Sequence, residues 1–455
     1  MIEVLSVTEK DLDVKLKLRK ANIAVIGLGY VGLPLAVGFA EADIQVTGYD
    51  IDEMRVQEIN QGRSHILDVA NQVLQPLVKK GKLAASHDFS NLRNDDVIFI
   101  CVPTPFTKAK DPDISYIESA AIAVSEVLRP EQLIVLQSTT FPGTTMEIVR
   151  PILEKSGLRA GIDFYLAFSP ERIDPGNKNY SAKNTPKIVG GMDEKSTKLA
   201  CEVFEFLMNK KDIHPVSSPG VAEMCKLLEN SFRSVNIALV NELAMLCYRM
   251  KLDVFEVIDA AATKPFGYMP FYPGPGVGGH CIPVDPYYLS WKAREYNFYT
   301  NFIELAAEVN QGMPLYAINR LAEILNFNGK AIRNSRILIM GVTFKKNIPD
   351  TRNSPAIEML QILLERGADV SYTDPFVLTL HLGESDHPAQ NKESHEMHSV
   401  KIDEDLLRTC DCVLIAVPHD RFDLKQVVEH SSLVFDTVNA TGKIIGRSSD
   451  KIHKL

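Results

Sequence analysis

Apolar positions in the first half of the chain fall into short β-rich runs separated by longer stretches with helical spacing. The short runs occupy five places: 22–26, 45–50, 97–102, 133–138 and 164–169. One of the helical stretches is 114–128. This alternation is typical of βαβ units, in which helices link parallel strands. It predicts a doubly wound α/β domain over residues 21–215, preceded by an N-terminal extension over 1–20.

The middle of the chain is helical in its patterning. From Pro219 to Met250 apolar residues recur every three or four positions, with no proline after 219 and no glycine after 220. Such a stretch predicts a single helix of about 45 Å, long enough to connect two domains or to form an oligomer interface. A second helix is expected over 302–326, where Pro314 should kink or split it. These helices define a central helical domain over 216–325.

The last third repeats the first in outline. RILIMGVTF at 336–344, PAIEMLQILLERG at 355–367 and ADVSYTDP at 368–375 again predict strand, turn, helix and strand. CVLIAVPHD at 412–420 echoes IFICVPTPF at 98–106. The sequence therefore predicts an internal duplication, with a second α/β domain over 326–455.

Composition limits the classes of protein to consider. A chain of 455 residues exceeds one hydrophobic core, and 45% apolar residues indicate a globular protein. The first twenty residues carry too many charges for a signal peptide, and no stretch is long and apolar enough to span a membrane. The seven cysteines are dispersed, which suits a reducing cytoplasm. A formal net charge of −9 argues against a nucleic-acid partner.

A glycine-rich turn follows the first expected strand. Gly27, Gly29 and Gly32 have the G-x-G-x-x-G spacing, in which the glycines permit a tight turn, close approach of a pyrophosphate and close helix packing. Asp50 follows about 20 residues later, where a carboxylate accepts a hydrogen bond from a ribose 2′-hydroxyl. The alternative is a plain structural turn, but strand, helix and acid in register favour a dinucleotide site.

The second copy of the α/β unit lacks the triple-glycine turn. Gly341 is followed by VTFKKNIPDTRNSP, in which Lys345, Lys346 and Arg352 form a local cationic cluster. This cluster suits an anionic nucleotide. A solvated basic loop remains the alternative.

One cysteine stands in a loop of unusual composition. Cys281 lies in GPGVGGHCIPVDPYYL, at 274–289, among glycine, proline and valine. A buried structural cysteine is expected in an apolar helix or strand, and zinc needs three or four ligands where only His280 is near. A Cys-His hydrolase is disfavoured because catalytic partners come from separate segments, so His280 is expected to serve loop packing or hydrogen bonding. The loop favours a reactive thiol.

Five motifs in order resemble the UDP-sugar 6-dehydrogenases, a group that includes UDP-glucose and UDP-N-acetylhexosamine dehydrogenases. They are GLGYVGLP at 27–34, SPERIDPG at 169–176, AEMCKLLEN at 222–230, GVGGHCIPVD at 276–285 and TFKKNIPDTR at 343–352. The resemblance covers nearly the whole chain. It implies two Rossmann-like domains joined by a helical region, a UDP-sugar substrate, NAD as cofactor, no metal, and a homodimer or higher homo-oligomer.

The chemistry of such an enzyme explains the cysteine. Oxidation of an alcohol to an acid removes four electrons, whereas one NAD accepts two, so two oxidations are needed. The first gives an aldehyde, which has no second hydride to give until a nucleophile adds to it. A thiolate adds to form a thiohemiacetal, whose oxidation leaves a thioester that water hydrolyses.

The resemblance also assigns residues to roles. Lys226 and Asn230, four apart on one helix, would stabilise an oxyanion beside Cys281. Asp285 and Glu171 would manage protons and the hydrolytic water, which Thr139 would hydrogen-bond near the nicotinamide. The cofactor contacts implied are Gly27, Gly29, Tyr30, Val31, Gly32, Asp50, Arg55, Thr104 and Thr139. The substrate contacts implied are Glu171, Arg172, Ile173, Lys226, Asn230, Tyr272, Gly276, Lys345 and Arg352.

One position departs from the group. Val438 stands where members commonly have an arginine associated with the substrate site, which puts sugar contacts near this residue in doubt. SPER followed by PG, together with GGHCIPVDPYYL, is similar to the acetamido-sugar branch, so UDP-N-acetylglucosamine is the expected substrate, used for surface polysaccharide precursors. UDP-N-acetylmannosamine, UDP-N-acetylgalactosamine and UDP-glucose remain alternatives. A two-electron β-hydroxyacid dehydrogenase would need neither Cys281 nor the last domain, and a non-catalytic binding protein would not need the catalytic residues.

Overall fold

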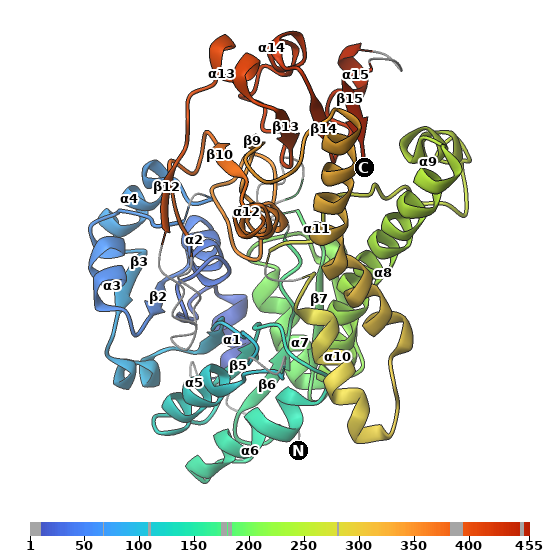
Figure 1. Cartoon of the computed structure of the whole chain (residues 1–455). Helices are drawn as coiled ribbons and strands as arrows, with labels where there is room; N and C mark the ends of the chain where they lie inside the picture. The colour runs from blue at the N-terminus through green and yellow to red at the C-terminus, as the bar shows by residue number, and fades with distance from the viewer. Residues whose placement is uncertain are drawn as a thin grey trace, which may run out of the picture. The chain divides into compact units, whose positions relative to one another are not determined.

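The computed structural model describes residues 11–66, 68–107, 111–173, 180, 184–279, 282–382, 395–445 and 450–455. The chain divides into two compact units (Figure 1). Unit 1 comprises Met1–Glu229 with Tyr287–Phe298, and unit 2 comprises Asn230–Pro286 with Tyr299–Leu455. The long helix α8 (Pro219–Met250) begins in unit 1 and ends in unit 2, and α10 (Asp285–Ala293) is likewise divided.

Unit 1 contains an eight-stranded sheet in the order β3-β2-β1-β4-β5-β6-β7-β8. All neighbouring strands pair in parallel except β6 and β7, which pair antiparallel. The order reverses at β1, whose Ile23 lies in register between Val46 and Val97. A reversal of this kind leaves a crevice at the carboxyl ends of the strands, where doubly wound domains bind ligands. The strands are β1 (Ile23–Ile26), β2 (Val46–Tyr49), β3 (Leu83–Ser86), β4 (Val97–Ile100), β5 (Leu133–Leu136), β6 (Tyr165–Phe168), β7 (Lys187–Gly191) and β8 (Ile213–Val216).

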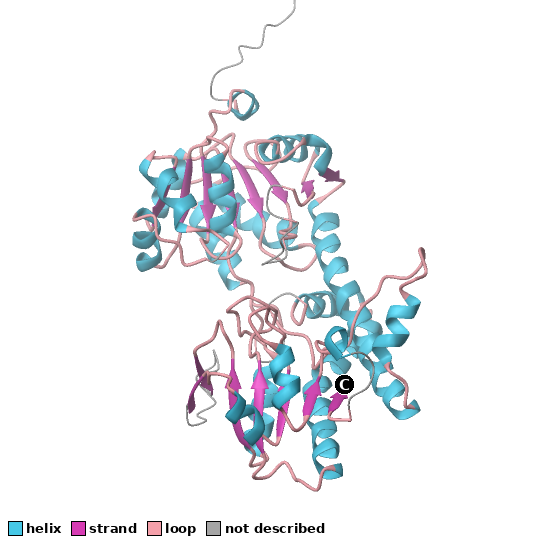
Figure 2. Cartoon of the chain, turned by 90° about the horizontal axis from the view of Figure 1, so that it is seen from above, coloured by secondary structure: helices cyan, strands magenta, loops and turns pink. Residues whose placement is uncertain are grey.

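Helices cover both faces of this sheet (Figure 2). Successive residues of β1 enter different cores: Ile23 and Val25 belong to one buried cluster, and Ala24 and Ile26 to the other. Strands buried on both faces read as continuous apolar runs, which explains the β-rich segments of the sequence. The helices are α1 (Leu12–Lys17), α2 (Gly32–Glu41), α3 (Glu53–Asn60), α4 (Asn71–Lys79), α5 (Ser115–Ser125), α6 (Arg150–Leu153) and α7 (Glu194–Phe204).

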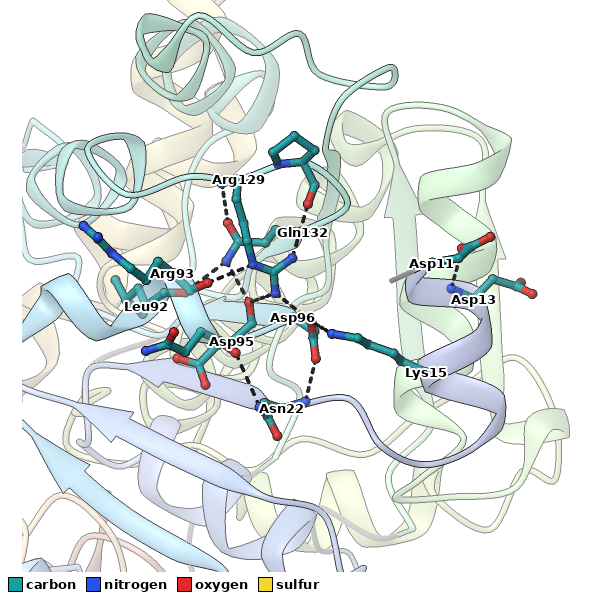
Figure 3. A network of polar contacts seen from close by, with 12 residues as sticks. Asp11, Asp13, Lys15, Asn22, Leu92, Arg93, Asp95, Asp96, Arg129 and Gln132 are labelled. Carbon is teal, nitrogen blue, oxygen red and sulfur yellow. Dashed lines mark hydrogen bonds and ion pairs between the residues drawn. The ribbon is translucent and has the colours of Figure 1, made fainter. Parts of the chain in front are cut away.

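The helix α1 is fastened to unit 1 by a polar network at the amino ends of the strands (Figure 3). The buried Asp96, just before β4, accepts hydrogen bonds from Lys15 of α1 at 2.6 Å and from Arg129 at 2.7 Å. Its other oxygen accepts from the Asn22 amide at 3.0 Å. Leu12 and Leu16 of α1 pack into the larger core of the unit. The N-terminal extension is therefore, from residue 12, an integral part of this unit.

Unit 2 contains a parallel five-stranded sheet in the order β10-β9-β13-β14-β15 and a separate antiparallel hairpin, β11 with β12. Alternate residues of β9 again enter two cores, Ile337 and Ile339 on one side, Leu338 and Met340 on the other. The strands are β9 (Arg336–Met340), β10 (Asp369–Thr373), β11 (Thr379–Leu382), β12 (His395–His398), β13 (Cys412–Ile415), β14 (Val434–Asp436) and β15 (Ile452–Lys454). The helices are α9 (Val254–Ala261), α11 (Asn301–Phe327), α12 (Pro355–Glu365), α13 (Glu404–Thr409), α14 (Leu424–His430) and α15 (Gly442–Ile445).

The predicted fold class is confirmed, and α8 has the predicted bounds. Of the two outcomes expected of Pro314, a kink or a split, the split is wrong, because α11 runs through Pro314 without interruption. Pro314 removes one backbone hydrogen bond, but it is buried together with Met313 and Ala317, and this packing holds the helix on both sides of it. Within the described ranges, no helix combines the length and the apolar character that crossing a membrane requires.

Candidate active site

The turn from β1 to α2 has the geometry that its three glycines require. Gly27 has a φ of +88°, and a Cβ there would lie 2.6 Å from the Cys101 carbonyl oxygen. A Cβ on Gly32 would overlap the carbonyl oxygen of Gly27. A Cβ on Gly29 would meet nothing within 4 Å. Gly27 and Gly32 are thus explained by the fold itself, whereas Gly29 faces open space, as a glycine should where a ligand approaches the backbone.

The first turn of α2 fits a pyrophosphate. Its N-cap residue, Val31, makes no side-chain cap, the Leu33 amide donates to the Gly29 carbonyl at 3.1 Å, and the positive end of the helix dipole favours an anion. Tyr30, beside it, is exposed, and Thr104, beyond β4, accepts a hydrogen bond from Tyr288 through its carbonyl. A glycine turn that opens a helix in this way suits an anion that binds backbone amides.

Asp50 follows β2 at the same edge of the sheet and is buried. One carboxylate oxygen accepts from the Leu28 amide at 2.8 Å and from Arg55 at 2.9 Å, and the other accepts from the Asp52 amide at 3.0 Å. The carboxylate therefore fixes the glycine turn and neutralises Arg55, and it keeps acceptor capacity for a ribose hydroxyl.

A buried carboxylate, Glu171, lies just beyond β6. Its Oε1 accepts from the backbone amides of Arg172 and Ile173, at 2.7 and 2.9 Å. Its Oε2 accepts from Lys187 at 2.8 Å and from Gln137 at 3.0 Å. Burial raises the pKa of Glu171, but Lys187 and the two amides together lower it by more, so the net shift of the pKa is downward. Glu171 is an ionised group with four donors.

The loop after β5 contains Thr139, which is half-buried, and is tied to the first turns of α8. Glu223 of α8 is buried and accepts from the amides of Gly143 and Thr145, at 2.6 and 2.9 Å, and from the Thr145 hydroxyl at 2.6 Å. Burial raises the pKa of Glu223. Glu223, in the motif AEMCKLLEN, thus fixes the loop that presents Thr139.

Two further residues of α8 are the expected oxyanion donors. Lys226 and Asn230, one helical turn apart, are both buried, which is unusual for a lysine. Within unit 2, the Asn230 amide nitrogen donates to Asp285, the buried first residue of α10. The structure thus joins Asn230 to Asp285, while Lys226 and Glu171 belong to unit 1.

Cys281 and His280 lie outside the described residues, but the loop that precedes them is fixed within unit 2. The Gly274 amide donates to Asn241 of α8 at 3.0 Å. Gly279 is held from both sides, because its amide donates to the Arg352 carbonyl at 3.1 Å and its carbonyl accepts from the Asn353 side chain at 3.0 Å. A Cβ on Gly276, where φ is +134°, would lie 3.1 Å from Pro355. The approach to Cys281 is therefore built against the segment 352–355.

The segment 352–355 begins with Arg352, which belongs to the basic cluster with Lys345 and Lys346. The Arg352 guanidinium binds both carboxylate oxygens of Asp350, and Lys346 pairs with Asp420 at 2.5 Å. Lys345 is half-buried. A pocket of about 320 Å³ opens here, lined by Lys346, His419, Asp420, Phe422 and Asn439 among others. Its lining comes from segments that follow β9, β13 and β14, at the carboxyl ends of parallel strands.

Other residues implied by the resemblance have structural partners. The Arg172 guanidinium donates to the Pro186 carbonyl at 2.8 Å and pairs with Glu229 at 2.7 Å. The Tyr272 hydroxyl donates to Asp259 at 2.8 Å. Val438 packs with the smaller core of unit 2, near the position of Gly274.

Family models match three consecutive parts of the chain. The NAD-binding domain of the UDP-glucose/GDP-mannose dehydrogenase family matches residues 21–208, its central domain matches 220–312, and its UDP-binding domain matches 338–443. The chain belongs to this family.

Relatives that are named for an enzymatic activity align with this chain over most of its length. The chain is 37% identical to a UDP-N-acetyl-D-glucosamine 6-dehydrogenase of Pseudomonas aeruginosa, over 79% of this chain and 84% of the relative. It is 38% identical to a UDP-N-acetyl-D-mannosamine dehydrogenase of Pyrococcus horikoshii, over 79% and 85%. The solved structure of a UDP-D-ManNAc dehydrogenase from Pyrococcus horikoshii has a TM-score of 0.84 and 33% identity, covering 95% of this chain and 98% of that one.

Membership confirms the resemblance drawn from the five motifs. This member of the UDP-glucose/GDP-mannose dehydrogenase family is an NAD-dependent UDP-sugar dehydrogenase, with an NAD-binding domain at its N-terminal end and a UDP-binding domain at its C-terminal end.

Three polar residues beside the expected site were missed from the sequence: Gln137, Lys187 and Glu223. Gln137 stands in QSTT, two residues before Thr139, and Glu223 stands in the motif that also holds Lys226. Lys187 begins the otherwise apolar run KIVGG, and a single charge at the head of a buried strand was the available signal. The sequence does not reveal that β7 pairs with β6, which is the contact that brings Lys187 to Glu171.

Proposed function

We propose that this enzyme oxidises the C6 hydroxyl of a UDP-N-acetylhexosamine to the uronic acid, with UDP-N-acetylglucosamine as its main substrate. The support is the family, the acetamido-sugar relatives and the motifs SPER and GGHCIPVD. The product would supply a surface polysaccharide pathway. UDP-N-acetylmannosamine is the main rival substrate, because relatives of nearly equal identity carry the two names.

The proposed reaction is a four-electron oxidation through Cys281. NAD, when bound, accepts one hydride in each of two oxidations. Between them the Cys281 thiolate adds to the C6 aldehyde, forming a C–S bond and a thiohemiacetal, which the second oxidation converts to a thioester. Water adds to the thioester carbon, the C–S bond breaks, and the uronic acid leaves while the thiol is restored.

Each proposed helper has a chemical task. Lys226 and Asn230 donate to the oxygen on C6 as it becomes an oxyanion. Asp285, hydrogen-bonded by Asn230, accepts and returns the proton of the C6 hydroxyl and of water. Glu171 supplies a fixed negative charge near the water that Thr139 orients. Lys345 and Arg352 hold the diphosphate of the substrate.

The observation that carries this proposal is the double anchoring of Gly279 by Arg352 and Asn353, two residues before Cys281. A loop that only connects two elements needs no such support, whereas a nucleophile must be held in place. The test is a panel of UDP-sugars in which NADH is counted per sugar consumed. Two NADH with an acetamido sugar support the proposal. One NADH per sugar would instead indicate a two-electron dehydrogenase, and none with any sugar would indicate a binding protein.

The covalent step has a separate test. Wild-type enzyme is quenched during turnover and its peptides are weighed, and the peptide with Cys281 should carry the mass of the sugar nucleotide. Cys281→Ser should lack that adduct and lose turnover by orders of magnitude, because a hydroxyl is a far weaker acid than a thiol. Four-electron turnover by Cys281→Ala near the wild-type rate would refute the covalent route.

We also propose that the enzyme is a homodimer formed through α8. Its part in unit 2 exposes apolar side chains at helical spacing, namely Phe232, Leu239, Leu243, Leu246 and Met250. An apolar stripe of this kind on a long helix is typical of an interface. Light scattering should give two chains for the wild type and one for Leu239→Glu/Leu246→Glu, with the exposed Leu378→Glu as the control.

Cysteine chemistry supports a reducing compartment such as the cytoplasm. The six cysteines in the described ranges are all unpaired thiols. A nucleophilic Cys281 would also need to remain reduced.

A further inference from the structure

A lysine that no part of the proposed mechanism uses lies beside the Glu171 carboxylate. Lys187, the first residue of β7, has a side chain only 1% exposed. A buried ammonium is expensive unless it is paired, and the Lys187 Nζ lies 2.8 Å from Glu171 Oε2. Its other neighbour is the ring of Phe204, with the centroid at 5.8 Å. The charge of Lys187 is therefore directed at one carboxylate.

The described neighbours of the Glu171 carboxylate are groups of defined charge. Gln137, after β5, donates its amide N–H to Oε2, and its own oxygen accepts from the Cys101 thiol at 3.8 Å. The amides of Arg172 and Ile173 bind Oε1. The Arg172 guanidinium turns to the Pro186 carbonyl and to Glu229. Lys187 is thus the cation that directly contacts Glu171 among the described residues.

Stability alone does not account for this arrangement. Replacing a buried ion pair with apolar groups of similar volume is often neutral for stability, so the pair is weak evidence of a purely stabilising role. Glu171 is also a group that the proposed mechanism uses. A carboxylate with four donors is a weak proton acceptor, but its charge and orientation are fixed.

We propose that Lys187 is a positioning residue for the oxidation, which holds Glu171 ionised and fixes its carboxylate toward the reaction site. This inference rests on the proposed function and adds to it a residue outside the five motifs. Glu171 then acts as a permanent negative charge, and proton transfer is left to Asp285.

The pH dependence of turnover follows from the sign of the shift. The pKa of Glu171 is lowered in the folded enzyme, so its negative charge is kept throughout the neutral range and to a lower pH than that of an ordinary glutamate. Without Lys187, burial dominates and the pKa rises above its ordinary value. A neutral residue at 187 should therefore bring protonation of Glu171 into the assay range.

The experiment compares Lys187→Met and Lys187→Arg with the wild type in pH profiles of kcat. Lys187→Met should move the acidic limb upward by at least about one pH unit and lower kcat by about tenfold for each pH unit below the new limb, with the KM for NAD unchanged. Lys187→Arg keeps the charge and should restore the wild-type limb. Lys15→Met is the matched control, because Lys15 also pairs with a buried carboxylate, that of Asp96 at 2.6 Å, but at the amino ends of the strands. It should leave the profile unchanged.

A double variant tests the inference even if Lys187→Met alone fails to fold. Glu171→Gln/Lys187→Met removes both charges and leaves none unpaired, and its kcat should equal that of Glu171→Gln. A double variant more than threefold slower than Glu171→Gln would show that Lys187 acts on something else, and a wild-type pH profile in folded Lys187→Met would equally overturn the inference. Both outcomes require that the wild type forms NADH from a UDP-sugar. If it forms none with any UDP-sugar, the proposed function is rejected, and this result is distinct from the two outcomes that overturn the role of Lys187.

Discussion

Alanine at Gly278 should disable the enzyme without unfolding it. A Cβ at this position would lie 2.6 Å from Phe344 Cβ and 2.7 Å from the Asn353 carbonyl oxygen. Ordinary carbon contacts are about 3.5–4.0 Å, so loop or partner must move by about 1 Å. Neither contacted atom is the end of a flexible side chain, and the loop carries Cys281 three residues later. Overpacking of this size costs about 1–3 kcal/mol, and a shift of about 1 Å can cost on the order of 100-fold in rate.

The assay is steady-state NADH formation with the best UDP-sugar, together with thermal unfolding. Gly278→Ala should lower kcat by roughly 100-fold, lower the melting temperature slightly, and leave the KM for NAD unchanged. Gly274→Ala is the matched control in the same loop, because its Cβ would meet only Val438, at 3.9 Å. Wild-type kcat in Gly278→Ala would show that the segment 352–355 does not position Cys281. An equal loss in Gly274→Ala would show that any side chain in the loop is harmful.

Three further predictions concern cofactor, substrate and the N-terminal helix. Asp50→Ser should raise kcat/KM for NADP relative to NAD, because it removes a carboxylate that repels the 2′-phosphate and releases Arg55, and an unchanged ratio would contradict this. Lys345→Ala should raise the KM for the UDP-sugar with little change in kcat, whereas an unchanged KM would favour a solvated loop. Leu16→Ala should destabilise unit 1 by about 2–5 kcal/mol in thermal unfolding, while the exposed Leu18→Ala serves as the control and should be neutral.

The strands at the centre of each sheet could be predicted because their physics is local. Ile23 to Ile26 and Ile337 to Met340 are buried on both faces, and such strands are continuous apolar runs. The glycine turn was predictable for a related reason, since a positive φ at Gly27 and helix packing at Gly32 leave little choice of residue. The bounds of α8 follow from an unbroken helical period between Pro219 and Met250.

The surroundings of Glu171 could not be predicted, because they depend on a pairing between distant segments. β7 joins the sheet antiparallel to β6, and only this pairing brings Lys187 to Glu171. The same holds for Asn353, which reaches Gly279 across 74 positions of the chain. A sequence pattern identifies which residues carry charge or amides, but the contact between such residues is a property of the tertiary fold. The expectation that Pro314 could split its helix failed for the same reason, because the cost of a proline is local and the packing that offsets it is not.

The two α/β units use one turn in two different ways. Gly27 and Gly341 both have positive φ, and the residues after them, Leu28 and Val342, both donate to an aspartate that follows the next strand, Asp50 or Asp374, at 2.8 Å. The two turns differ in the other partners of the aspartate carboxylate.

Among the described contacts, Asp50 Oδ1 accepts one hydrogen bond, whereas each oxygen of Asp374 accepts two, including one from His419. The His419 Nε2 lies 3.0 Å from Asp374, and its Nδ1 accepts from the Asn347 amide at 2.9 Å, so the imidazole is a neutral bridge with its proton on Nε2. That bridge occupies acceptor capacity of Asp374 and ties the segment 343–347 to it. In the second unit the aspartate thus supports a basic loop through His419. We therefore expect the UDP-binding unit to recognise its ligand through the cations of that loop and not through a ribose-binding aspartate.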